Sequence, residues 1–365
     1  MASPLETLSR RASYGLAQGS RVAWYVAHGY AMGRLRRLAE EAMPRMARAE
    51  APQPTRPVPP QRVLWRDLAR LFARDLANVE AGHYPMPRDE DGLGDRLDRS
   101  LAFFADLPRI FERRRTGAHQ EVFAEARRPG LPRYYLQNFH FQTGGYLSEE
   151  SARIYDVQVE VLFNGTANAM RRQALVPIAT HLRGRDQRHM AMADIACGTG
   201  RFLRMAREAF PGLRTVGIDL SEAYAREARR HAGGRGRGGG GVLVAKAEAL
   251  PLADASQDIV SSIFLFHELP PKVRREVAAE FARVLKPGGI AVFMDSLQLG
   301  DVEGYDGLLE RFPHGFHEPY YASYIREDLT ALFQGAGLDP VSSEPMFVSR
   351  LMVLRKPADG SGDHV

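Results

Sequence analysis

Hydrophobic and polar positions in the second half of the chain follow two alternating patterns. Short apolar runs lie at Met190–Ile195, Thr215–Ile218, Val242–Val244, Asp258–Phe264 and Gly289–Met294. The segments between them have apolar residues at three- and four-residue steps, at Arg201–Ala209, Ser221–His231, a short segment after Leu252, and Pro271–Leu285. Strands that alternate with helices predict βαβ units and a parallel sheet covered on both faces.

The chain ends on a different pattern. Two apolar segments, Asp339–Ser343 and Met346–Leu354, follow one another without a helical segment between them. Such neighbours can pair antiparallel at a sheet edge. The fold class is therefore expected to be α/β: a Rossmann-like, seven-stranded sheet, mostly parallel with a reversed edge strand, plus an N-terminal helical region.

The first 150 residues read as helical. Residues 1–60 form a helical arm and a proline-rich linker, because APQPTRPVPPQ (51–61) cannot continue a helix. Residues 61–148 form a helical lid, with apolar faces at Leu64, Leu68, Leu71, Phe72 and Leu76, and at Leu97, Leu101, Phe104, Leu107 and Phe111. A helix over 151–182 opens the main domain, 149–356, and 357–365 is a disordered tail.

The amino-acid composition bears on the class of protein and on its expected location in the cell. Of 365 residues, 44% are hydrophobic and 25% charged, as in soluble globular proteins, and the net charge is +5. The single cysteine, Cys197, excludes an intrachain disulfide, so a reducing, cytoplasmic location is expected. The N-terminal arm is expected to pack on the main body of the protein. A second hypothesis is weak contact with a membrane surface near Trp24 and the basic residues 34–37. Oligomeric state is left open.

The stretch DIACGTGRFL (194–203) is a glycine turn between a strand and a helix. A dinucleotide fingerprint needs a third glycine or alanine where Leu203 stands, and a Walker loop needs a Gly-Lys-Ser/Thr ending, which is absent. Asp194 ends the strand directly before the turn. A carboxylate there disfavours a pyrophosphate and favours a ligand ammonium group. Asp219, at the end of the next strand, lies where a carboxylate bonds ribose hydroxyls.

Four segments in order, DIACGTGRFL, VGIDLS, AEALPLADASQDIVSSIFLFHEL and ARVLKPGGIAVFMDS, resemble the class I S-adenosylmethionine-dependent methyltransferases, of the type 11-like group. The resemblance covers about residues 151–356. It implies S-adenosyl-L-methionine as cofactor, bordered by Asp194, Ala196, Gly198, Gly200, Asp219, Leu220, Ala247, Glu248 and Phe264. Ala196 replaces the family's first glycine, a small change in size. Lys246 replaces an aspartate often found before Ala247, which leaves the adenine contact to Glu248 or to backbone.

Two aromatic-rich stretches are expected to cover the methyl acceptor: 134–156 and 312–327. The acceptor is expected to be a small, partly apolar or aromatic molecule. If it must lose a proton, His267 is the first candidate base, followed by His140 and Tyr321. His314, His317 and Glu318 lack an H-E-x-x-H arrangement and a clear further ligand, so no metal is expected.

Several alternatives stay open. Segment 155–175 faintly resembles ubiquinone/menaquinone-biosynthesis C-methyltransferases, which does not fix the acceptor. A methyltransferase acting on RNA or protein is one rival, and a non-catalytic cofactor-binding scaffold is the other. Nucleic acid is a less favoured partner, because the glycine- and arginine-rich run 233–241 is better explained as a loop insertion. For Cys197, packing beside the cofactor is favoured over a role as nucleophile.

Overall fold

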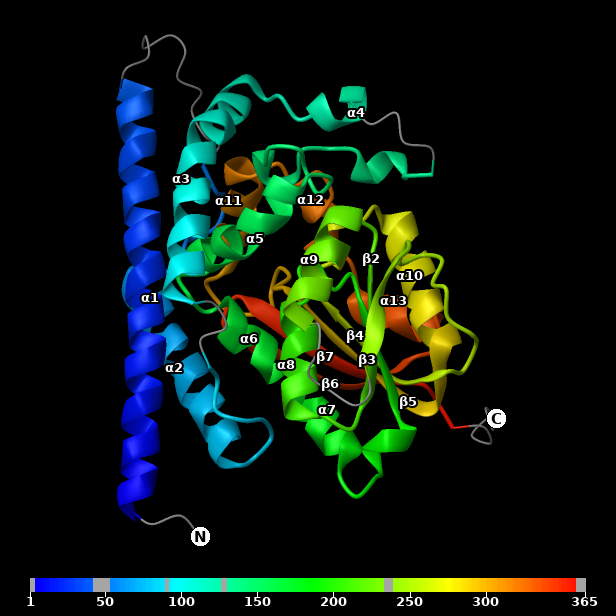
Figure 1. Ribbon diagram of the computed structural model, residues 1–365. Helices are drawn as coiled ribbons and strands as arrows, with labels where there is room; N and C mark the ends of the chain where they lie inside the picture. Colours follow the sequence, from blue (N-terminus) through cyan, green and yellow to red (C-terminus); the bar gives the residue numbers. More distant parts are fainter. Residues whose placement is uncertain (1–3, 42–52, 89–91, 126–129, 233–238, 359–365) are drawn as a thin grey trace.

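A seven-stranded sheet forms the centre of the molecule, with helices on both faces and a layer of N-terminal helices along one side (Figure 1). The computed structural model describes residues 4–41, 53–88, 92–125, 130–232 and 239–358. The strands are β1 Ala191–Ile195, β2 Arg214–Asp219, β3 Gly239–Val244, β4 Gln257–Ile263, β5 Leu285–Ser296, β6 Asp339–Met346 and β7 Ser349–Arg355. They match the seven apolar runs in number and order.

The strand order is β3-β2-β1-β4-β5-β7-β6. The first five strands in the chain pair in parallel, and β7 runs antiparallel to both β5 and β6. The chain reverses from β1 outward to β2 and β3, then crosses to β4 and β5. A parallel sheet with such a reversal opens a crevice at the carboxyl ends of β1 and β4.

Helices cover both faces of this sheet. In chain order they are α1 Pro4–Glu41, α2 Gln61–Glu80, α3 Leu93–Thr116, α4 Glu121–Glu125, α5 Glu149–Leu162, α6 Ala167–Gln173, α7 Leu175–Leu182, α8 Arg201–Ala209, α9 Glu222–Ala232, α10 Pro271–Val284, α11 Asp306–Gly315, α12 Tyr321–Tyr324 and α13 Leu329–Gly335. One buried core joins α10 and α13 to the sheet, and another joins α6, α7 and α8 to the opposite side. Among these helices, none is both long enough and apolar enough to cross a membrane.

Two predicted helices are wrong. The expected helix over 151–182 is three helices. Asn164 and Gly165 adopt left-handed backbone between α5 and α6, and a second break at Ala174 separates α6 from α7. A side chain at Gly165 would lie 3.1 Å from the Cα of Val22, so the break admits the close approach of α1. The expected short helix after Leu252 is a series of turns.

The apolar face of α3 also differs from expectation. Leu97 and Leu101 are exposed, whereas Phe103 and Leu107 are buried. The buried side of α3 packs on α1 and α5 around Tyr25. The run 233–238 and the last seven residues of the predicted tail lie outside the described residues.

A buried carboxylate connects the N-terminal helices to the rest of the chain. Asp75 of α2 is fully buried and accepts hydrogen bonds from the hydroxyl groups of Tyr14 in α1, at 2.5 Å, and of Tyr84, at 2.7 Å. It also pairs with the guanidinium of Arg172 in α6, with an Nη2–Oδ2 distance of 2.6 Å. Because breaking one partner of such a buried pair typically costs about 3–5 kcal/mol, this cluster holds α1, α2 and α6 together.

Candidate functional site

The glycine turn between β1 and α8 borders a first cavity of about 110 Å³ at the carboxyl ends of β1, β2 and β4. Gly200 caps α8 with φ +81°, and a side chain there would come within 2.9 Å of the Cα of Ala228. Ala196 has φ +55°. The cost of alanine at this position is therefore conformational, about 1 kcal/mol, rather than the change in size expected from the sequence.

Leu203 occupies the position at which a dinucleotide fingerprint has its third glycine. Its side chain fits there because Gly217 of β2 has no side chain of its own. A side chain at Gly217 would lie 2.8 Å from Leu203 Cδ2 and 2.9 Å from Cys197 Sγ. Both side chains pack over this glycine. Burial raises the pKa of the Cys197 thiol, which makes it a packing residue rather than an activated nucleophile.

Two acids lie beside the turn. Asp194 is buried, its Oδ1 accepts a 2.6 Å hydrogen bond from Ser261, and its Oδ2 has no hydrogen-bond partner among the described residues. Burial raises the pKa of Asp194 to about 7. Asp219 accepts 2.8 Å hydrogen bonds from the backbone N–H groups of Gly198 and Ser221, and burial raises its pKa to about 6.

The other predicted cofactor residues are distributed around the same space. Leu220, Ala247 and Phe264 line the first cavity. Glu248 does not line it; its carboxylate accepts hydrogen bonds of 2.9 and 3.0 Å from the hydroxyl of Tyr134. The aromatic stretch 134–156 covers this cavity with the side chains of Tyr134, Tyr135, Phe139, Tyr146 and Tyr155.

A second cavity, of about 420 Å³, lies next to the first and shares three lining residues with it: Tyr155, Phe264 and Glu268. Most of its wall is apolar and comes from the N-terminal helices α1 and α2, from α5 and from α11. Its polar lining includes His140, His267, Glu268, Ser296 and Tyr321. The three candidate catalytic residues proposed from the sequence, His267, His140 and Tyr321, thus all line the second cavity.

His267 is held by a residue that the sequence analysis did not single out. Its Nδ1 lies 2.5 Å from a carboxylate oxygen of Asp295, at the end of β5, and its Nε2 lies 3.7 Å from Glu268. Burial opposes protonation, but Asp295 and Glu268 outweigh it and raise the pKa of His267 to about 10. The imidazole of His267 is therefore positively charged at neutral pH, and it would have to lose this proton before it could act as a base. Its role as a base stays a prediction.

Tyr321 and His140 have different surroundings. The Tyr321 hydroxyl lies 2.8 Å from the Ser296 hydroxyl, and burial raises the pKa of Tyr321. His140 lies in a left-handed turn, with φ +57°, and its ring nitrogens face Glu268 and Glu318. From the sequence, Glu318 was considered only as a metal ligand, and Asp295 and Glu268 could be suspected only as acids at or after the end of a strand.

Parts of the chain are similar in sequence to known methyltransferases. Residues 192–289 match the family model described as methyltransferase domain. The chain is 38% identical over 102 residues to a malonyl-[acyl-carrier protein] O-methyltransferase of Methylococcus capsulatus, covering 28% of this chain and 36% of that protein. It is 31% identical over 162 residues to a ubiquinone/menaquinone biosynthesis C-methyltransferase of Methylobacterium nodulans, covering 44% and 62%.

The chain therefore spans less than two thirds of the length of either relative. Among solved structures, an S-adenosylmethionine-dependent methyltransferase of Methanosarcina mazei is similar, with a TM-score of 0.38 and 20% identity, over 47% of this chain and 95% of that chain.

Proposed function

We propose that this chain, which carries a class I S-adenosylmethionine-dependent methyltransferase domain, transfers the methyl group to a small, partly apolar acceptor bound in the second cavity. The observation that carries the proposal is the contact between the two cavities. One borders the glycine turn and its two acids, and the other is mostly apolar and shares Tyr155, Phe264 and Glu268 with it. Transfer requires donor and acceptor to be aligned in adjoining, water-poor spaces.

The residues of the first cavity suit the cofactor. Asp194 is a buried carboxylate with one unsatisfied oxygen, which favours a cationic group over a phosphate. Asp219 would hold the ribose hydroxyls, and Arg171, which lines the cavity, would pair with the methionyl carboxylate. When bound, S-adenosylmethionine supplies a methyl group on an activated sulfonium.

The chain's own part is to align the acceptor and exclude water. We expect His267, His140 and Tyr321 to contact the acceptor's polar group, because all three line the polar part of the second cavity. The apolar wall from α1, α2 and α11 would bind the rest of the acceptor. Burial of apolar acceptor surface contributes about 25 cal/mol per Å², so such a wall favours an apolar or aromatic body.

The test is to incubate the full chain with methyl-labelled S-adenosylmethionine and three cell fractions: organic-soluble small molecules, protein and RNA. We expect label in the organic-soluble fraction. Label confined to RNA or protein would support the rival acceptor classes. Cofactor binding by calorimetry without label in any fraction would support the scaffold alternative. In a deletion strain, the acceptor should accumulate as a compound that is one methyl group lighter than the product found in the wild-type strain.

Cofactor binding should also release a proton from Asp194. Its pKa of about 7 lies above the ordinary value, so the group is largely protonated at pH 6 and ionised above pH 8. A ligand ammonium binds the ionised form better, so affinity should rise with pH through about 7. Calorimetry at pH 6 in buffers of different ionisation enthalpy should show proton release.

Replacing Asp194 with asparagine should reduce that release and weaken cofactor binding about 10-fold, as expected for loss of one charge-assisted contact. The exposed pair Asp186 and Arg188 gives a matched control, since Asp186→Asn should change neither quantity. Equal proton release in wild type and Asp194→Asn would contradict the assignment.

A further inference from the structure

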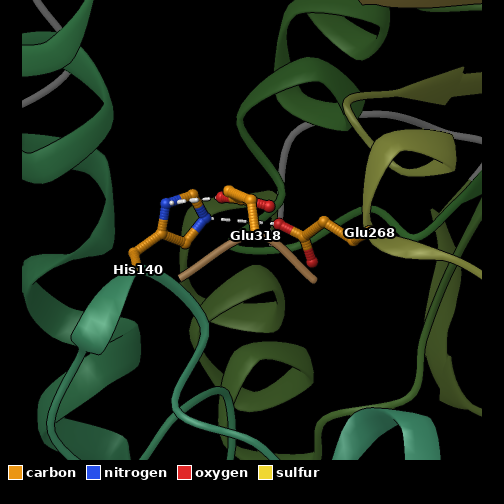
Figure 2. A group of neighbouring side chains, drawn as sticks. All are labelled: His140, Glu268 and Glu318. Atoms are coloured by element: carbon orange, nitrogen blue, oxygen red, sulfur yellow. Dashed lines mark hydrogen bonds and ion pairs between the residues drawn. The ribbon is translucent and has the colours of Figure 1, made fainter. Parts of the chain in front are cut away.

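Three side chains with metal-ligand chemistry meet at the edge of the second cavity (Figure 2). His140 comes from the turn Phe139–Phe141, Glu268 from the turn after β4, and Glu318 from the segment between α11 and α12. His140 Nδ1 lies 3.0 Å from Glu318 Oε1, and His140 Nε2 lies 3.3 Å from Glu268 Oε1. One ligand atom of each residue lies within 4.8 Å of the others.

The cluster has more negative charge than its surroundings offset. The Glu318 side chain is completely buried, and neither of its oxygens accepts a hydrogen bond among the described residues. Its side chain forms an ion pair with His140. The carboxylates of Asp295, Glu268 and Glu318 face two imidazoles, those of His140 and His267, so one negative charge stays unmatched even with both imidazoles protonated. The Tyr146 hydroxyl donates a hydrogen bond to Glu268 but carries no charge. A buried carboxylate without a matching charge either takes up a proton or is accompanied by a cation or a metal ion, and the second outcome is the one that the metal-binding experiment tests.

We propose that His140, Glu268 and Glu318 bind one divalent transition-metal ion. An imidazole nitrogen with two carboxylate oxygens is a donor set for Mn²⁺, Fe²⁺, Co²⁺ or Zn²⁺, whereas Mg²⁺ and Ca²⁺ prefer oxygen alone. Ligand bonds of about 2.0–2.2 Å place neighbouring donor atoms about 3.0–3.4 Å apart. Glu318 faces Nδ1 of His140 and Glu268 faces Nε2, so binding one ion through a single ring nitrogen requires the side chains to move until their donor atoms, which now lie within 4.8 Å of one another, reach this spacing.

From the sequence, His314, His317 and Glu318 were considered and no metal was expected, and the proposed set is a different one. Glu318 belongs to it, but His317 does not, because its Nε2 lies 2.9 Å from the side-chain oxygen of Gln137 and its ring stacks on His119. The side chain of His314 lies outside the described part of the structure. His140 and Glu268 are 128 residues apart, so no local spacing could indicate the site.

His140 and Glu268 line the second cavity, so the remaining coordination positions of the ion would face it. An oxygen or nitrogen atom of the acceptor could occupy one of them. This extension to the acceptor rests on the proposed function, whereas metal binding by the three side chains does not.

The experiment is to strip the purified full chain with a chelator, dialyse it separately against Mn²⁺, Co²⁺ and Zn²⁺, and measure bound metal by mass spectrometry. We expect about one ion per chain for at least one metal. The Co²⁺ protein should show visible absorption bands that report coordination by nitrogen and oxygen. No metal above the dialysis background would overturn the proposal.

Glu318→Gln should bind the metal at least 10-fold more weakly and lose the Co²⁺ bands. Glu344→Gln, at an exposed acid, is the matched control and should behave as wild type. His189→Ala tests adventitious binding, because His189 and Asp186 form an exposed pair. Wild-type binding by Glu318→Gln would overturn the proposal.

Folding and function are separated by a second measurement on the same samples. Glu318 does not line the first cavity, so calorimetric binding of S-adenosylmethionine should persist in Glu318→Gln and show that the variant is folded. If that variant does not fold, Glu318→Asp, which keeps the charge but shortens its reach, takes its place with the same expected loss. Cofactor binding without metal would reject the metal site alone.

Discussion

Replacing Asp219 with alanine should weaken S-adenosylmethionine binding about 100-fold. The substitution removes the carboxylate proposed to hold the ribose, and contacts with charged groups contribute about 1.5–3 kcal/mol each. It also removes the acceptor for the backbone N–H groups of Gly198 and Ser221, both at 2.8 Å, so the glycine turn loses its attachment to β2. Isothermal titration with S-adenosylmethionine measures the effect.

Two variants separate these contributions. Asp219→Asn keeps an oxygen acceptor for one backbone N–H group, so its loss of affinity should be smaller. Asp254→Ala removes an exposed acid of the same domain and should leave affinity unchanged. An Asp219→Ala protein with wild-type affinity would show that the ribose lies elsewhere.

Replacing Gly29 with tryptophan should lower methyl transfer about 100-fold while cofactor affinity stays within about twofold, because small displacements of a bound reactant cost about that much in rate. Gly29 is part of α1 and lines the second cavity, and a Cβ atom there meets nothing within 4 Å. An indole at this position would extend into the acceptor's space. The measurement is label transfer to the organic-soluble fraction, with calorimetry for the cofactor.

Gly33→Trp is the matched control. Gly33 lies one helical turn further along α1, also has nothing within 4 Å of a Cβ atom, and does not line the second cavity. Both substitutions replace glycine inside a helix, so neither should destabilise the helix backbone. Full transfer by Gly29→Trp would exclude the second cavity as the acceptor site.

The strands of the sheet could be predicted from sequence because each is marked by residues that are neighbours along the chain. Each buried strand is an apolar run, and α8 begins and ends at the predicted residues, Arg201 and Ala209, because Gly200 and the apolar spacing define it. The broken helix after α5 was not predictable from spacing. Gly165 lies against the backbone of α1, about 140 residues away in sequence. That contact exists only in the folded chain.

The same distinction holds for the site. Asp194 and Asp219 could be chosen as candidates from sequence because each lies at the end of a strand, Asp194 directly before the glycine turn and Asp219 at the end of the next strand. Asp295, Glu268 and Glu318 acquire their meaning from partners that the fold brings together, such as His140 and His267. The family resemblance implies that Glu248 lies beside the adenine. Its carboxylate accepts a hydrogen bond from Tyr134, and its contact with the cofactor stays a prediction.

The position of Asp75 limits how the chain can be divided into fragments. A fragment starting at residue 149 would keep the glycine turn and the whole sheet, yet lose the partner of the Arg172 guanidinium and uncover apolar side chains of α6 and α7 that Leu71 and Tyr84 contact. Such a fragment would expose an apolar surface and would therefore tend to aggregate. We therefore expect the N-terminal helices and the sheet to need expression together as one folded unit.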